Sequence, residues 1–183
     1  GKILAVHAEN DMLTASLAQK AQADGRLAVI DYLHSRPAIA EQEAIQRAIL
    51  FAEATGCRLH IVHVSTAKGV DMVNSAREQG VDVTCETCPH YLVFSEADVE
   101  RIGALAKCAP PIRTSDEREV LWEQVLQGKV NFIASDHSPA PLNMKQSDNF
   151  FAVWGGIASC QSTLSLLLTA GYHERGLSLQ RIA

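Results

Sequence analysis

A chain of 183 residues that is 47% hydrophobic and 20% charged has the composition of an ordinary globular protein with one core. Its formal net charge of −5 excludes a basic surface for nucleic acid, and no apolar run approaches the length of a membrane span. Its five cysteines lie in or beside apolar segments, which predicts mostly buried free thiols in a reducing cytoplasm.

The first third of the chain predicts one strand followed by two helices. Residues 3–6 are an apolar run of the kind found in a strand that is buried on both faces. Residues 11–23 carry apolar side chains at helical spacing, and residues 40–55 carry an apolar stripe that predicts an amphipathic helix. Between these helices, residues 32–37 are expected to form a loop, because a residue before proline leaves the helical region.

The rest of the chain continues to alternate between strand and helix. Strands are predicted over residues 58–65, 81–86 and 130–135, and helices over residues 67–79, 116–126 and 158–169. A long irregular region is expected before the helix at residues 116–126, whose Val120, Leu121 and Val125 should face inward. The alternation predicts βα units and a parallel sheet. Long loops after the third and fourth strands favour half of an eight-stranded barrel over an open sheet, because barrel enzymes carry their chemistry there.

Each predicted strand ends near a side chain that can bind a metal ion. The first ends in His7, the second in His63, the third just before His90 and the fourth in Asp136. Taken singly, such a histidine is more often a hydrogen-bonding residue, and an aspartate at a strand end can also be a base or cap a turn. Because parallel strands end at one edge, we expect these side chains to meet. Histidines with a carboxylate suit zinc or a similar divalent ion.

Other histidines and cysteines are expected to be structural. Cys85 and Cys88 have the CxxC spacing of a redox pair or of half a zinc site, but the chain has no second such pair and a strand end fits better. His60 lies well before its strand end, whereas His34 and His173 are expected to face solvent.

Several blocks of residues together resemble the cyclic amidohydrolases, a superfamily that includes dihydroorotases, hydantoinases and allantoinases. The blocks are residues 6–10, 61–65, 85–91, 109–113 and 135–139. A further block, Trp154-Gly155-Gly156-Ile157 with Met144-Lys145 before it, looks most like the allantoinase branch. The resemblance covers nearly the whole chain in the right order.

This resemblance implies a TIM-type (β/α)8 barrel, of which residues 1–183 form about strands five to eight, the second half of one metal-dependent hydrolase domain. The His-x-His pair and the carboxylated lysine that bridges two metals in this superfamily have no counterpart in the chain. We therefore expect the chain to be a segment of a longer protein and to be inactive alone.

The resemblance also implies a centre of two divalent ions, with zinc first and cobalt, nickel or manganese as alternatives. His7 and His63 match two histidine ligands, and Asp136 matches an aspartate that binds metal and moves the proton. Arg36 could equally form an ordinary salt bridge, and the glycine pair before Ile157 an ordinary turn. The residues expected to contact substrate are Ala109, Ser138, Trp154 and Gly155, and those expected behind the ligands are Asn10, Arg36 and His90.

The implied reaction is hydrolysis of the cyclic amide of allantoin to allantoate in purine catabolism. The alternatives are a hydantoinase or dihydropyrimidinase, a dihydroorotase, or a non-catalytic relative of the barrel. Retention of His7, His63 and Asp136 argues against the last alternative. The expected partners are a small cyclic ureide and further copies in a homotetramer, with neither nucleic acid nor a membrane.

Overall fold

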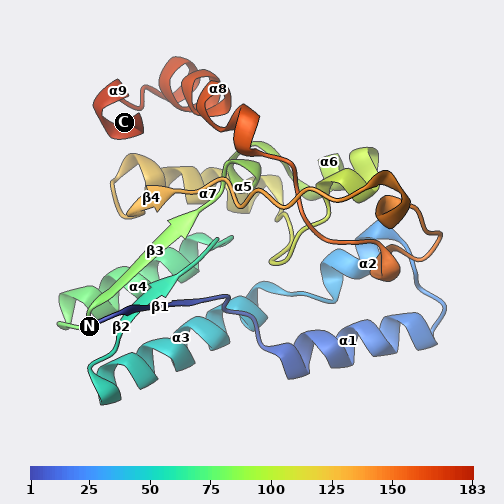
Figure 1. Cartoon of the computed structure of the whole chain (residues 1–183), viewed down its shortest axis with the longest axis horizontal. Coiled ribbons are helices and arrows are strands. Elements are labelled where there is room, and N and C mark those ends of the chain that lie inside the picture. The colour runs from blue at the N-terminus through green and yellow to red at the C-terminus, as the bar shows by residue number, and fades with distance from the viewer.

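The computed structural model describes all 183 residues and contains one four-stranded parallel sheet. Its strands lie in chain order (Figure 1) and are β1 (Ile3–Val6), β2 (Arg58–Ile61), β3 (Val83–Thr87) and β4 (Phe132–Ile133). Each strand pairs in parallel with the next one along the chain, so every connection must cross from one end of the sheet to the other. The predicted α/β alternation and parallel sheet are confirmed.

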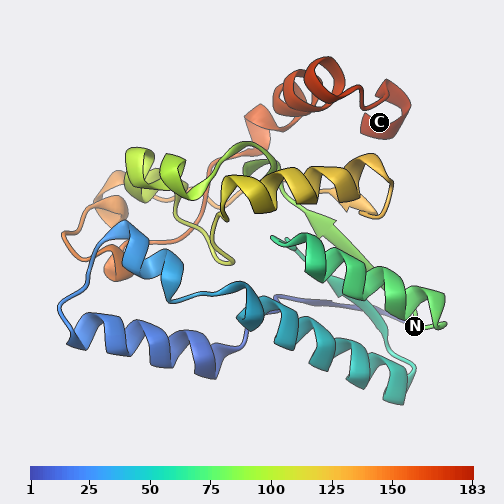
Figure 2. The ribbon, with the colours of Figure 1, turned by 180° about the vertical axis from the view of Figure 1, so that it is seen from behind.

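Helices supply these connections and cover one face of the sheet. The longer helices are α1 (Asp11–Ala23), α3 (Ala38–Thr55), α4 (Ala67–Glu78) and α7 (Ser115–Leu126). The shorter ones are α2 (Val29–His34), α5 (Pro89–Val93), α6 (Glu96–Ile102), α8 (Thr163–Leu166) and α9 (Leu179–Ile182). Figure 2 shows α3, α4 and α7 side by side over the sheet, whereas no helix lies in front of the opposite face in Figure 1. None of these helices combines the length and apolar character needed to cross a membrane.

Short helical turns fill the segments around the sheet. The 3-10 turns are η1 (Gly103–Ala106), η2 (Leu142–Lys145), η3 (Phe150–Ala152) and η4 (Cys160–Ser162), and η5 (Leu167–His173) is a π-helix. The core is one cluster of 32 buried hydrophobic residues that joins β2 and β3 to the covering helices. It includes Ile45 of α3, Val70 of α4 and Trp122 of α7, none of which is more than 1% exposed. The sheet is therefore held from its helical face.

Several boundaries differ from the expectations. The segment expected as a loop at residues 32–37 contains the end of α2, because the helix stops at His34, before the proline restriction applies at Arg36. The expected irregular region holds α5, α6 and η1, which are 5, 7 and 4 residues long and too short to show an amphipathic pattern. Short helices of this kind leave little periodic signal.

The burial of β1 and of one residue in α7 was predicted wrongly, whereas Leu121 and Val125 of α7 are buried as predicted. The apolar strand β1 has Ile3 and Leu4 each 54% exposed, because it pairs only with β2 and its other edge is open. Val120 of α7 is 44% exposed, while its neighbours Leu121 and Trp122 are buried.

The second strand ends at Ile61 instead of residue 65, because the backbone turns sharply near His63.

Candidate metal centre

The chain turns out of the sheet at two residues that the sequence had marked as metal ligands. His63, with φ 41°, and Asp136, with φ 44°, are the two non-glycine residues whose backbone lies in the left-handed region. Ordinary side chains avoid this region, and such strain is concentrated at functional sites. Backbone pairing with the third strand reaches both turns, since Val64 N, just after His63, donates to Glu86 O, and Ala134 N, just before Asp136, donates to Thr87 O. Each turn thus changes the direction in which one side chain, that of His63 or Asp136, leaves the strand end.

The first two strand ends bring two imidazoles into contact. Val6 and Ile61 are partners in the β1–β2 register, which places His7 beside the turn at His63. Nδ1 of His7 lies 3.1 Å from Nε2 of His63, and the rings meet edge to face with centroids 4.8 Å apart. Burial and the neighbouring His7 lower the pKa of His63, although Asp136 opposes the shift. His63 is therefore favoured in the neutral form that binds metal.

A buried carboxylate holds the other side of His7. Glu9 Oε2 lies 3.2 Å from Nε2 of His7, and the Glu9 side chain is 2% exposed. Arg36 donates to both oxygens of this carboxylate through Nε, at 3.2 Å, and through a shorter contact from Nη2. Burial opposes ionisation of Glu9, but hydrogen bonds from His7 and Arg36 prevail and lower its pKa. A carboxylate behind a histidine is a recurrent way to orient a metal ligand.

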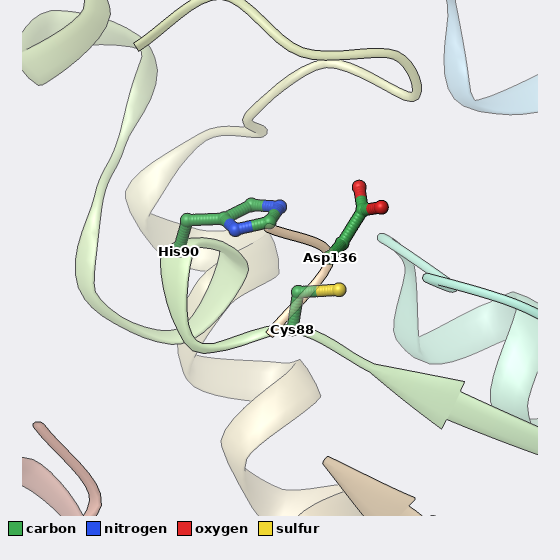
Figure 3. Close-up of side chains that lie close together, drawn as sticks. All are labelled: Cys88, His90 and Asp136. Carbon is green, nitrogen blue, oxygen red and sulfur yellow. The ribbon is translucent and has the colours of Figure 1, made fainter. Parts of the chain in front are cut away.

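The third and fourth strand ends meet around Asp136. Figure 3 shows Cys88, His90 and Asp136 pointing toward one another, and their ligand atoms all lie within 4.8 Å of each other. Cys88 and His90 are buried, whereas Asp136 is exposed. Neither ring nitrogen of His90 has a hydrogen-bond partner, and burial lowers its pKa to about 3. The sequence analysis placed His90 behind the ligands, whereas it considered Cys88 as half a zinc site and took it to be structural.

The segment from η2 to the pair Gly155-Gly156 is held by two buried lysines. Nζ of Lys145 donates to the carbonyls of Ala104, Trp154 and Gly156. Nζ of Lys107 donates to three carbonyls as well, those of Phe150, Phe151 and Val153. Both ammonium groups therefore replace their lost hydration with backbone oxygens, and they fix the segment from η2 to the glycine pair.

Gly156 takes a conformation that requires glycine. Its φ is 142°, and a Cβ there would run into the backbone oxygen and side chain of Ser138. Gly156 N donates to Lys107 O at 2.7 Å, and Ser138 N donates to Ile157 O at 3.0 Å. The segment Trp154–Ile157, here called the glycine loop, is thus attached directly to the residues that follow Asp136. Trp154 is 47% exposed and Ala109 is half-buried beside Cys108, so both can be reached from solvent.

Other marked residues have structural roles. Asn10 caps α1, accepting from Leu13 N at 3.0 Å, and donates to Glu43. His137 Nδ1 accepts hydrogen bonds from the backbone N–H groups of residues 159 and 160, which ties the C-terminal segment to the fourth strand end. His60 contacts Thr84 at 2.8 Å and Glu86 at 3.1 Å within the sheet.

Glu9, Lys107 and Lys145 are the residues that sequence reasoning missed. Glu9 lies inside the block of residues 6–10, two residues after the candidate ligand His7, and this spacing could have indicated that it belongs to the site. The signal for Lys107 was a single charge in the apolar run from Leu105 to Cys108. Lys145 carried no local signal beyond its block, because its carbonyl partners lie up to 41 residues away.

The chain is similar to known proteins along its whole length. A family model described as Dihydro-orotase-like matches residues 1–69. An allantoinase of Rubrobacter xylanophilus is 60% identical over 97% of the chain, and an allantoinase of Solibacter usitatus is 55% identical over all of it. An L-hydantoinase (dihydropyrimidinase) from Arthrobacter aurescens superimposes with a TM-score of 0.95 at 36% identity over 99% of the chain.

These relatives are longer than the chain. It spans 39% and 40% of the two allantoinases and 41% of the hydantoinase. Within that span, the residues that form the strand ends and the glycine loop all belong to the matched region. The sequence resemblance is therefore confirmed: the chain is similar over its whole length to allantoinases, at 44–60% identity, and to a hydantoinase of known structure.

Proposed function

We propose that the protein to which this chain belongs hydrolyses the cyclic amide bond of allantoin to give allantoate. The observation that carries the proposal is the 60% identity to an allantoinase over 97% of the chain, in a fold that brings His7 and His63 together. Asp136 follows the fourth strand at the same edge of the sheet. Dihydropyrimidinase or hydantoinase activity is the second candidate, because of the 0.95 TM-score to an L-hydantoinase.

The two histidines have the spacing expected of ligands to one ion. Zinc–nitrogen bonds of about 2.0–2.1 Å at tetrahedral angles put two ligand nitrogens roughly 3.3 Å apart. The distance of 3.1 Å between His7 Nδ1 and His63 Nε2 is close to that value. Both imidazoles would bind as neutral groups, and Glu9 would keep His7 in the correct orientation. These donors fit a divalent ion.

We propose a centre of two divalent ions, most simply zinc, to which this chain contributes His7, His63 and Asp136. The remaining donors, including a carboxylated lysine, would come from parts of the protein beyond these residues. When bound, such ions lower the pKa of a water molecule and polarise the amide carbonyl. Asp136 would take the proton of the attacking water and pass it to the departing ring nitrogen. Its exposed position leaves it free to reach both.

The substrate would lie between the strand ends and the glycine loop. A cavity of about 410 Å³ is lined by His90, Pro139, Gly156 and Ser159, among others, so it adjoins both. A ureide ring presents N–H donors and carbonyl acceptors in one plane, which backbone groups near Ala109 and Gly155 can match. Ser138 and Trp154 would flank the ring, because Ser138 N donates to Ile157 O, directly after the glycine pair.

The four strands would form strands five to eight of a (β/α)8 barrel in one hydrolase domain. In support, β1 and β4 each pair on one side only. An apolar groove of about 380 Å³ runs along β1 past Leu4, Val6 and Phe51, where a neighbouring element would pack. The family resemblance further suggests a homotetramer. The five cysteines are all free thiols, as is usual for a protein in a reducing cytoplasm.

A substrate panel tests the reaction. The full-length protein, loaded with zinc, is assayed on allantoin, hydantoin, dihydrouracil and dihydroorotate. We expect allantoin to give the highest kcat/KM, and turnover of hydantoin without turnover of allantoin would favour the second candidate instead.

Replacing the proposed proton carrier tests the mechanism. Asp136→Asn keeps the shape of the side chain and loses its basicity, so turnover should fall by at least the 10²–10⁴-fold typical of general acid–base groups. Circular dichroism should show an unchanged fold. Retention of activity would contradict the role of Asp136.

A further inference from the structure

Three donor side chains outside the histidine pair converge at the third strand end. Cys88 occupies the N-cap position of α5, and His90 is the second residue of that helix. Both are buried, so one rigid turn fixes the sulfur and the imidazole next to each other. Asp136 reaches the same point from the loop after β4, as Figure 3 shows. A thiol, an imidazole and a carboxylate are together a donor set for soft and borderline metal ions.

The two ring nitrogens of His90 form no hydrogen bond within the fold and are therefore free to bind a ligand. Only 2% of the residue is exposed, and neither Nδ1 nor Nε2 has a hydrogen-bond partner. Buried polar groups are nearly always satisfied, and an unsatisfied one calls for an explanation such as an absent ion. One ring nitrogen points toward Asp136 (Figure 3) and can offer its lone pair to a ligand there.

We propose that Cys88, His90 and Asp136 form a second binding position, which shares Asp136 with the proposed metal centre, for a thiophilic divalent cation such as Cd²⁺ or Zn²⁺. The sulfur would bind as a thiolate, and its proton would leave to solvent as the sulfur–metal bond forms. Hard ions such as Mg²⁺ would not compete, because they prefer oxygen ligands.

The three donor atoms need to move only a short distance toward one another to bind one ion. Donor atoms around one zinc-like ion lie roughly 3.3–3.6 Å apart, given bonds of about 2.0–2.3 Å. The three donor atoms now lie within 4.8 Å of one another. Asp136 is the exposed member, and it can move toward the two buried donors without disturbing the core.

Occupation of this position would inhibit the enzyme. Asp136 cannot serve as proton carrier while it is drawn toward Cys88 and His90, so the cation would act by withdrawing Asp136 from the histidine pair. This consequence rests on the proposed hydrolase function, whereas the binding position itself does not.

Cadmium titration of the full-length protein tests the binding. The exposed thiol of Cys160 and the partly exposed thiol of Cys57 are first removed by Cys160→Ser and Cys57→Ser. CdCl₂ is then added while the thiolate-to-metal charge-transfer absorption is followed. We expect one saturable band that Cys88→Ala abolishes. His90→Gln should keep the band but weaken binding by at least the 10–100-fold typical of losses around a metal site. MgCl₂ should produce no band.

The variants give decisive outcomes even if one fails to fold. Cys88→Ala removes a buried thiol, so its thermal melting is compared with that of the parent, and His90→Gln decides the question if the alanine variant is unfolded. Unchanged cadmium affinity in a folded Cys88→Ala protein, or in His90→Gln, would overturn the proposal.

Inhibition is measured separately, relative to each variant's own uninhibited rate. Cadmium should inhibit allantoin turnover by the Cys57→Ser/Cys160→Ser parent more strongly than turnover by Cys88→Ala. Equal inhibition would refute the withdrawal of Asp136. A protein that binds cadmium through Cys88 but never hydrolyses allantoin would refute the proposed function and leave the binding position standing.

Discussion

At the scale of single residues, the candidate centre depends on side chains that orient other side chains. His7 can present Nδ1 to His63 because Nε2 faces Glu9, which Arg36 holds in turn. All three links are within hydrogen-bonding distance, and the carboxylate is buried. The ring of His7 is therefore already oriented by the protein, which would reduce the entropy lost on binding of the proposed ion.

Glu9→Gln tests this orientation. The amide keeps the size of the carboxylate but loses its charge, and zinc affinity of the full-length protein should fall about 10–100-fold. Metal content after dialysis against a graded chelator series measures the change. Glu43→Gln is the matched control, because Glu43 also accepts a side-chain hydrogen bond but from Asn10. An affinity equal to that of the parent would show that Glu9 does not orient the ligand.

The glycine pair offers a second test at this scale. Gly156→Ala should strain the backbone at φ 142° and push against Ser138, at a cost of about 1–3 kcal/mol. Gly155→Ala is the control, because a Cβ there meets nothing within 4 Å. Thermal melting of the two full-length variants should separate them, and equal melting temperatures would contradict the steric argument.

At the scale of elements, α3 holds the turn that presents His63. Glu41 of α3 is 1% exposed and accepts four hydrogen bonds, from the backbone N–H and the hydroxyl of both Ser65 and Thr66. These residues lie between the turn at His63 and the start of α4. The carboxylate thus pins the end of the second strand segment to the helix layer, which helps to maintain the left-handed backbone of His63.

Glu41→Gln should loosen this attachment. An amide has one acceptor oxygen, so at least two of the four donors lose their partner, at about 1–3 kcal/mol for each group left unsatisfied. Glu53→Gln, an exposed change on the same helix, should have almost no effect. Denaturant unfolding of the full-length variants measures the difference. A Glu41→Gln protein as stable as the Glu53→Gln protein would remove the proposed role of this carboxylate.

At the scale of the whole molecule, the sheet is open at both edges and on one face. Ile3 and Leu4 of β1 and Phe132 of β4 are each more than half exposed. Exposed apolar strand edges promote pairing with other chains, and native proteins normally cover them. The parallel sheet therefore needs further protein around it to be stable.

The isolated 183-residue chain should consequently self-associate and should not hydrolyse allantoin. Sedimentation velocity over a range of concentrations measures the association, and the allantoin assay checks the activity. A monomer with one cooperative melting transition would show that the open edges are tolerated. Activity in that monomer would show that His7, His63 and Asp136 suffice for catalysis.

The sequence by itself determined the alternation of strands and helices, the span of α1 and the approximate positions of the strand ends. Those features depend on local periodicity and on caps such as Thr66, whose side chain accepts from Gly69 N. The parallel direction of the strands followed from the same alternation, which is why His7, His63 and Asp136 could be placed at one edge, whereas the order of the strands is seen only in the structure. Family resemblance supplied their expected roles.

Only the tertiary structure decided how those side chains are held. The left-handed backbone at His63 and Asp136, the carboxylate behind His7 and the unsatisfied ring of His90 leave no periodic pattern in the sequence. Each depends on groups far apart along the chain, as with His7 and His63, whose positions differ by 56. Such contacts form when packed helices and strands bring distant segments together, and local sequence patterns do not predict them.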